Sequence, residues 1–191
     1  DRTVIGNTTP KFSGGFGLNA TYKGFDMSMF FNFMYDFDVL NANKIMLTTW
    51  ADNKENNFLM DIASDKRWRN FDDMGNEIRY SPEVLAEFNK NATMWNPTSI
   101  GRPICMSYAV EDGSFLRLNS ATLGYTLPSV WTKKVGLSKV RFYVSGNNLF
   151  TLTGYSGYDP EVNIATGLTP NIDYDRYPRS RTYTFGAQLT F

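Results

Sequence analysis

Apolar and polar residues alternate strictly near the beginning of the chain. From Phe12 to Tyr22 every second residue is apolar or glycine, and the residues between them are Ser, Gly, Asn or Thr. The same period of two resumes at Phe25 and continues to Tyr35, which predicts two β-strands. If Lys23-Gly24 is a two-residue turn, the apolar members of every opposed pair share one face. The pattern predicts a hairpin with strands near 12–22 and 25–35.

Three further segments show strand periodicity. Ala121 to Leu127 alternates with Ser, Thr and Gly, but Leu116 and Leu118 are out of phase, which predicts a β-bulge near Asn119. The segment "VRFYVSGNNLF" alternates next, and "RTYTFGAQLTF" has the cleanest alternation in the chain. These segments predict strands near 115–127, 139–150 and 181–191.

A long excursion separates the first two strands from the other three. Residues 36–112 have no clean period and are rich in Asn, Asp, Trp and Pro, with a short helix predicted at 82–89, where Pro82 suits a first helical turn. Such a loop is unusual in a compact soluble domain but ordinary on one side of a membrane barrel. The four connections between the five predicted strands are therefore short, long, short and long, in chain order.

The strand dimensions favour a membrane barrel over a soluble sandwich. An eleven-residue strand, tilted by about 40°, covers roughly 25 to 28 Å, which matches the apolar band of an outer-membrane barrel. Aromatic residues also lie at both ends of the hairpin, as membrane-interface girdles require. Five strands with two open edges do not close a barrel, so the remaining strands must come from elsewhere. The alternative is a soluble β-sandwich module that binds glycan through surface aromatics.

Composition narrows the possible functions. The 191 residues contain no histidine and one cysteine, so an internal disulfide is impossible and most catalytic and metal-binding constellations are excluded. Nineteen basic residues balance nineteen acidic ones, without the basic patch that nucleic-acid binding requires. No apolar run is long enough for a transmembrane helix, although barrels cross membranes with strands. The chain opens without an initiator Met or a signal peptide, which suggests a piece of a longer polypeptide.

Two acidic motifs have a structural and a chemical interpretation. Asp159 and Glu161 flank a proline and are either an acid/base pair or, as we expect, turn carboxylates that accept backbone N–H bonds. "DDMGNE" at 72–77 has the oxygen ligands of a calcium loop without its spacing, so a solvated turn is expected. Arg117 and Arg141 fall inside strands and should face the lumen or the neighbouring wall, because an arginine in lipid is costly. We expect no catalytic residue, no metal and no cofactor.

Three strings resemble, in order and spacing, the C-terminal end of a known family. "VEDGSFLRLNSATLGYTLP", "VRFYVSGNNLFTLTGYSGYDPEV" and "YPRSRTYTFGAQLTF" are similar to the SusC/RagA family of TonB-linked (TonB-dependent) outer-membrane transporters of Bacteroidetes. "RTVIGNTTPKFSGGFGLNATYKGFDMSMFF" resembles the strand pair that precedes the family's long loop. The resemblance implies an all-β fold, namely the last five or so antiparallel strands of a 22-stranded barrel with long extracellular loops.

The resemblance also implies a function and a set of partners. The family imports oligosaccharides or peptides across the bacterial outer membrane, with the C-terminus in the periplasm. The implied partners are the remaining strands and the plug of the same barrel, TonB, a SusD/RagB-like surface lipoprotein that acts as a lid, and the lipid bilayer. Terminal aromatic residues of the family correspond to the signal read by the barrel-insertion machinery, here Tyr183, Phe185 and Phe191.

Loop aromatics are the candidates for substrate contact. Such rings stack on sugar rings or cradle apolar side chains of a peptide, or else hold the loops together. Trp95, beside Asn96-Pro97, is the first candidate. The others are Trp68, Trp50, Tyr155 and Tyr158.

Overall fold

The structure is a computed structural model that describes residues 2–49, 57–62, 66–98, 104–162 and 171–191. The chain forms two compact units, one of residues 1–39 and 110–191 and one of residues 40–109. The elements, in chain order, are β1 (Phe12–Tyr22), β2 (Phe25–Tyr35), β3 (Asp38–Asn41), α1 (Ala42–Met46), η1 (Met60–Ile62), α2 (Pro82–Phe88), η2 (Ser107–Ala109), β4 (Val110–Asp112), β5 (Phe115–Thr126), α3 (Ser129–Thr132), η3 (Lys133–Val135), β6 (Lys139–Thr153), β7 (Ile172–Asp173) and β8 (Thr182–Thr190).

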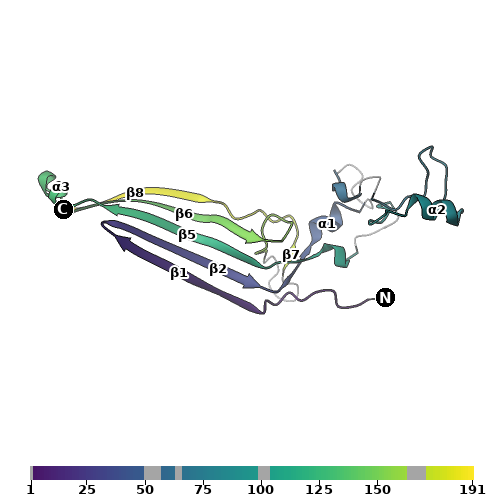
Figure 1. Ribbon diagram of the computed structural model, residues 1–191, viewed down its shortest axis with the longest axis horizontal. Helices are drawn as coiled ribbons and strands as arrows, with labels where there is room; N and C mark the ends of the chain where they lie inside the picture. Colours follow the sequence, from purple (N-terminus) through teal and green to yellow (C-terminus); the bar gives the residue numbers. More distant parts are fainter. Residues whose placement is uncertain (1, 50–56, 63–65, 99–103, 163–170) are drawn as a thin grey trace. The chain divides into compact units, whose positions relative to one another are not determined.

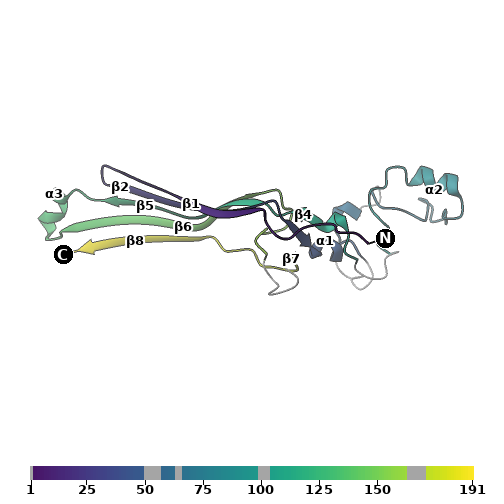
Figure 2. The same cartoon turned by 90° about the horizontal axis from the view of Figure 1, so that it is seen from below.

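The first unit is built on a five-stranded antiparallel sheet. Its strand order is β1-β2-β5-β6-β8, and each pair of neighbours is antiparallel (Figure 1). The turn between β1 and β2, the helix α3 and the C-terminus lie at one end of this sheet in both views (Figures 1 and 2). β7 lies at the other end, where the long connections begin. The five predicted strands are thus confirmed, and β3, β4 and β7, which form a second small sheet, were not predicted.

The hairpin register is the predicted one. Tyr22 opposes Phe25 and Phe12 opposes Tyr35, with Lys23 and Gly24 between the strands. Both turn residues have positive φ, of 46° and 90°, which is the backbone that a two-residue hairpin turn with native twist requires. Glycine at the second position adopts that conformation without steric cost.

Paired bulges keep the two faces of the sheet distinct. The register shifts at Asn119 in β5. Opposite it, β6 has its own irregularity at Asn148, whose φ is 53°. Because of these shifts, Leu116 and Leu118 return to the face that carries Ala121, as the bulge prediction required. The Gly-Asn-Asn sequence thus marks the irregular position within β6, a strand that continues to Thr153.

One face of the sheet is apolar from edge to edge. Rows of opposed residues run across the strands without a charge, for example Phe25, Tyr125, Phe142 and Ala187. Most of these side chains are at least partly exposed, as Phe185 with an exposed fraction of 79% illustrates, although Leu118 and Val140 are buried. A sandwich would bury this face against a second sheet, whereas a membrane barrel presents it to lipid. None of the helices in the described ranges is long and apolar enough to span a bilayer.

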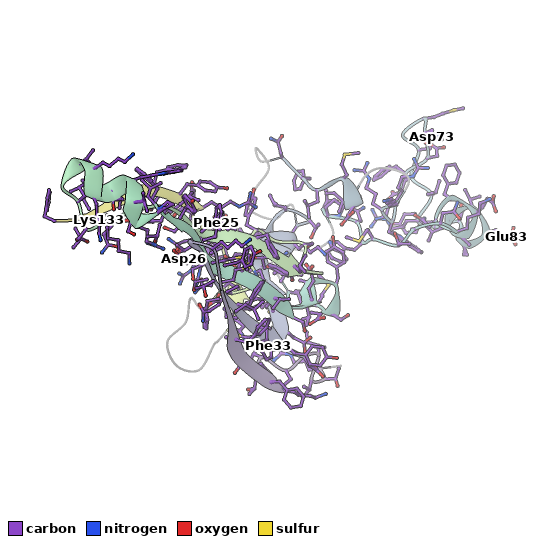
Figure 3. All side chains as sticks on the ribbon, turned by 60° about the vertical axis from the view of Figure 1, so that its left-hand side comes forward. Phe25, Asp26, Phe33, Asp73, Glu83 and Lys133 are labelled. Carbon is purple, nitrogen blue, oxygen red and sulfur yellow. The ribbon has the colours of Figure 1, made fainter. Side chains whose placement is uncertain are left out.

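The opposite face is polar and carries every charge of these five strands. The register places Asp26, Arg117, Lys139 and Arg141 there, among Ser, Thr, Asn, Gln and Gly. This face also carries four large apolar or aromatic side chains, namely Phe30, Met34, Phe115 and Tyr143. Phe30 packs over Gly15, where a Cβ would come within 2.8 Å of the Phe30 ring. Figure 3 shows Phe25 and Asp26 toward the end of the sheet that holds Lys133, with Phe33 farther along the strand.

A small buried cluster ends the polar face on the side of the long connections. Phe37, Val39, Phe115, Tyr155 and Val162 form it, and Met34 packs against it. Gly113 donates its N–H to the Phe37 carbonyl at 2.8 Å, and a Cβ there would meet Val39 at 2.6 Å. This cluster holds the segment that follows β6 against the end of the sheet from which the long connections leave.

Candidate functional site

The base of the loop after β6 is held by an ion-pair network. Arg117 projects from the polar face of β5 with a side chain only 2% exposed. Its Nη2 donates to Asp159 Oδ1 at 2.5 Å and lies 3.7 Å from Glu161 Oε2. Arg179 donates to the other Glu161 oxygen at 2.7 Å. Four charges from β5, from the loop and from the approach to β8 therefore neutralise one another.

This network decides how Asp159 and Glu161 behave. Burial alone would raise the pKa of Asp159, but hydrogen bonds from Arg117 and from the Glu161 N–H outweigh it and lower that pKa. A carboxylate held ionised by a buried guanidinium is a poor proton donor near neutral pH. Asp159 accepts the Glu161 N–H within a turn, which is the structural interpretation expected from the sequence. The ion pairs and this hydrogen bond together order the loop.

Tyr155 and Tyr158 lie in the same loop but in different environments. Tyr155 is 6% exposed and donates its hydroxyl to Asp173 Oδ2 at 2.6 Å. Burial first, and then the hydrogen bond to Asp173, raises its pKa, so the phenol stays neutral and serves as a donor. Tyr158 is 82% exposed and is the loop aromatic that a ligand could reach directly.

A second ion pair crosses the middle strand on the polar face. Arg141 of β6 donates through Nε to Asp26 Oδ1 at 2.9 Å and through Nη2 to Asp26 Oδ2. β5 lies between these two strands, and the pair passes over Gly124, where a Cβ would come within 2.6 Å of the Asp26 carboxylate. The absence of a side chain at Gly124 is thus what lets the bidentate pair form.

Trp95 is engaged inside the second unit. Its Nε1 donates to the Thr48 carbonyl at 3.2 Å, and its ring meets Tyr108 edge to face with centroids 5.2 Å apart. Tyr108 donates its hydroxyl to Asp61 at 2.6 Å, and the Lys44 ammonium lies 4.9 Å from the Tyr108 ring centroid. These contacts connect four parts of the long excursion. In the structure Trp95 therefore holds the loops together, which was the alternative to substrate contact.

Trp68 lines a cleft in the same unit, which we call the Trp68 cleft. Its volume is about 320 Å³, and its lining residues come from two segments, with Arg67, Trp68, Arg69, Phe71 and Asp72 on one and Asn96, Pro97 and Thr98 on the other. The segments are joined because Trp68 donates its N–H to the Met94 carbonyl at 2.8 Å. Asn89, the C-cap residue that follows α2, makes two hydrogen bonds with the Arg69 backbone.

The acidic motif beside the cleft forms a closed turn. Asp72 accepts from the Met74 and Asn76 N–H groups and from the Asn76 side-chain amide. The Asn76 side-chain bond first, and then the backbone bonds, lower the pKa of Asp72. Gly75 supplies the positive φ of the turn, at 85°. Within the described ranges no group of three or more Cys, Asp or Glu side chains is arranged to hold a metal ion.

The remaining predicted residues fall into two groups. Trp50 lies outside the described residues. Tyr183, Phe185 and Phe191 are all exposed, and the first two belong to the apolar face of β8. Sequence reasoning missed Arg67 and Phe71 of the cleft and the partners of the strand arginines, because those contacts depend on loops without a period.

Comparison with known proteins places this geometry in a family. No family model matches the sequence. The TonB-dependent receptor P3 of Formosa agariphila is 35% identical over 197 residues, which cover 100% of this chain and 17% of that receptor. The TonB-dependent receptor SusC of Bacteroides thetaiotaomicron is 36% identical over 88 residues, 44% of this chain and 8% of that protein.

A solved structure supports the same assignment. A chain of the RagAB peptide importer in its closed-closed state matches with a TM-score of 0.73 and 25% identity, over 96% of this chain and 17% of that one. The chain thus spans about a sixth of the length of these two relatives. Its apolar and polar faces are those of an outer-membrane barrel wall. The chain belongs to the SusC/RagA family of TonB-dependent outer-membrane transporters and forms a part of their β-barrel.

Proposed function

We propose that the chain supplies wall strands and extracellular loops to a TonB-dependent importer of oligosaccharides or peptides. The observation that carries the proposal is the separation of charge between the two faces of the sheet. All four charged residues of the five strands lie on the polar face, while the apolar face is continuous over the full width. A sheet with lipid on one side and a polar lumen on the other has this distribution.

The whole transporter requires parts beyond this chain. The edges of β1 and β8 need further strands of the same barrel, because unpaired edges are not tolerated in lipid. By family resemblance the other partners are a plug, TonB, and a SusD/RagB-like lipoprotein that closes over the loops. We assign the transporter no catalytic step of its own, since its role is passage of the substrate.

We further propose that the short connections and the C-terminus face the periplasm. The Lys23-Gly24 turn, the α3 connection and the C-terminus share one end of the sheet, and barrels of this type have their short turns on the periplasmic side (Figure 1). Exposed Tyr183, Phe185 and Phe191 would then be presented to the insertion machinery. The loops at 154–162 and 40–109 would lie outside the cell.

Cysteine labelling tests this orientation. The native Cys105 is free and exposed, so it is first replaced by serine in the full-length protein. Tyr158→Cys is expected to react with a membrane-impermeant maleimide on intact cells, and Val135→Cys only after the outer membrane is opened. The reverse pattern would contradict the orientation.

Uptake tests the transport function itself. Cells that lack the full-length gene should lose growth on at least one oligosaccharide or peptide, and the wild-type gene should restore it. Unchanged growth and unchanged uptake of labelled substrates over a broad panel of both classes would contradict an import role.

A further inference from the structure

The Trp68 cleft combines a guanidinium without a partner and two accessible aromatic rings. Arg67 is half-buried in its lining, and no ion pair or hydrogen bond engages its side chain anywhere in the ranges that the structure describes. Trp68 and Phe71 are 41% and 50% exposed. We propose that the cleft recognises an acidic saccharide residue, one that carries a carboxylate on its ring. This inference rests on the import function proposed above and names a substrate class for it.

The other charges of the cleft already have partners, which leaves Arg67 for the ligand. Arg69 donates to Asp73 at 2.7 Å, and its guanidinium lies 5.3 Å from the Phe88 ring centroid. The Asp72 carboxylate accepts three hydrogen bonds within its own turn. A half-buried arginine pairs with a carboxylate more strongly than an exposed one, because the surrounding dielectric is lower. Its planar fork also matches a carboxylate in bidentate geometry.

The aromatic rings supply a flat apolar surface beside that charge. Trp68 and Phe71 occupy one segment of the lining, and the fully buried Pro97 lies in the opposite segment. Aromatic side chains with one open face gain most from a flat partner, and a pyranose ring offers such a face of C–H groups. A volume of about 320 Å³ is at the small end of ligand pockets, so the cleft suits one saccharide residue of a longer chain.

The backbone around the cleft argues against a peptide that binds as an added strand. One common way for an extended peptide to bind is to add as a strand to a free strand edge. Here the Trp68 N–H is taken by the Met94 carbonyl, the Met94 N–H by the Lys66 carbonyl, and the Thr98 N–H by the Asn96 side chain. The lining therefore recognises its ligand through side chains, as expected for a charged ring.

Binding to the purified full-length transporter with its lipoprotein tests the inference. The probes are a panel of uronic-acid oligosaccharides, each paired with its carboxyl-reduced neutral counterpart, together with acidic peptides of similar length. Calorimetry on the wild type should give at least one pair in which the acidic form binds about tenfold more tightly. Arg67→Met should remove that preference, and Trp68→Ala should weaken both members of the pair.

Matched variants keep this test specific. Lys66→Met removes an adjacent cation that does not line the cleft, and Tyr80→Ala removes an exposed aromatic outside it, so both should bind like wild type. The inference is overturned if no pair shows an acidic preference, if Arg67→Met retains it, or if only acidic peptides bind in an Arg67-dependent way. Uptake that depends on the gene would leave the import function standing in each of those cases.

Discussion

The two faces of the five-stranded sheet are specified in different ways. On the apolar face, a residue needs only to be apolar or small, and no charge appears there in any of the five strands. On the polar face, each charged pair depends on one particular geometry, such as the passage of the Arg141–Asp26 pair over Gly124. Composition is therefore enough for the side that meets lipid, whereas the lumen side requires specific partners.

The two strand arginines show what those partners accomplish. Arg141 binds a neighbour within the wall, so its pair stiffens the sheet itself. Arg117 binds Asp159, a loop residue 42 positions away, and thereby ties the loop to the wall. Removal of Arg117 should thus affect the loop more than the barrel.

The largest expected effect comes from Arg117→Met in the full-length transporter. Loss of Arg117 leaves the Asp159 carboxylate without its cation, while Glu161 keeps only Arg179, and breaking a buried pair in this way costs about 3 to 5 kcal/mol. We expect protease cleavage in the 154–162 loop and a lower temperature of conversion to the unfolded form on a gel. Arg179→Met, which removes a more exposed partner of Glu161, should cost less. Equal effects of the two variants would contradict the central role of Arg117.

The next effect separates the faces directly. Ala187→Arg places a charge on the apolar face of β8 and should cost up to about 2 to 4 kcal/mol, with loss of folded barrel in the outer membrane. Gln188→Arg adds the same charge one residue later on the polar face and should assemble. Comparison of heated and unheated membranes on a denaturing gel measures both. Normal assembly of Ala187→Arg would contradict lipid contact on that face.

Most of the sheet could be predicted from the sequence, because alternation fixes faces and a two-residue turn fixes register. The displaced phase of Leu116 and Leu118 even revealed the bulge at Asn119. The loop contacts could not be predicted in this way. Arg117 meets Asp159, and Trp68 meets the Met94 segment, through turns with no repeat. The small sheet of β3, β4 and β7 was missed for the same reason, since strands of two to four residues carry too few periods.

The smallest expected effect is a pH dependence confined to the polar face. The pKa of Asp159 is lowered in the folded protein, so its contribution to stability is complete above its unfolded pKa of about 3.9 and is lost as the pH falls through the lower folded value. The apolar face has no carboxylate in its strands and adds nothing in this range. Loop protection from an acid-active protease should therefore decline below about pH 4 in the wild type, whereas Asp159→Asn should be cleaved at every pH. If the wild-type loop stays protected below about pH 4, Arg117 must hold it by contacts other than the one with the Asp159 carboxylate.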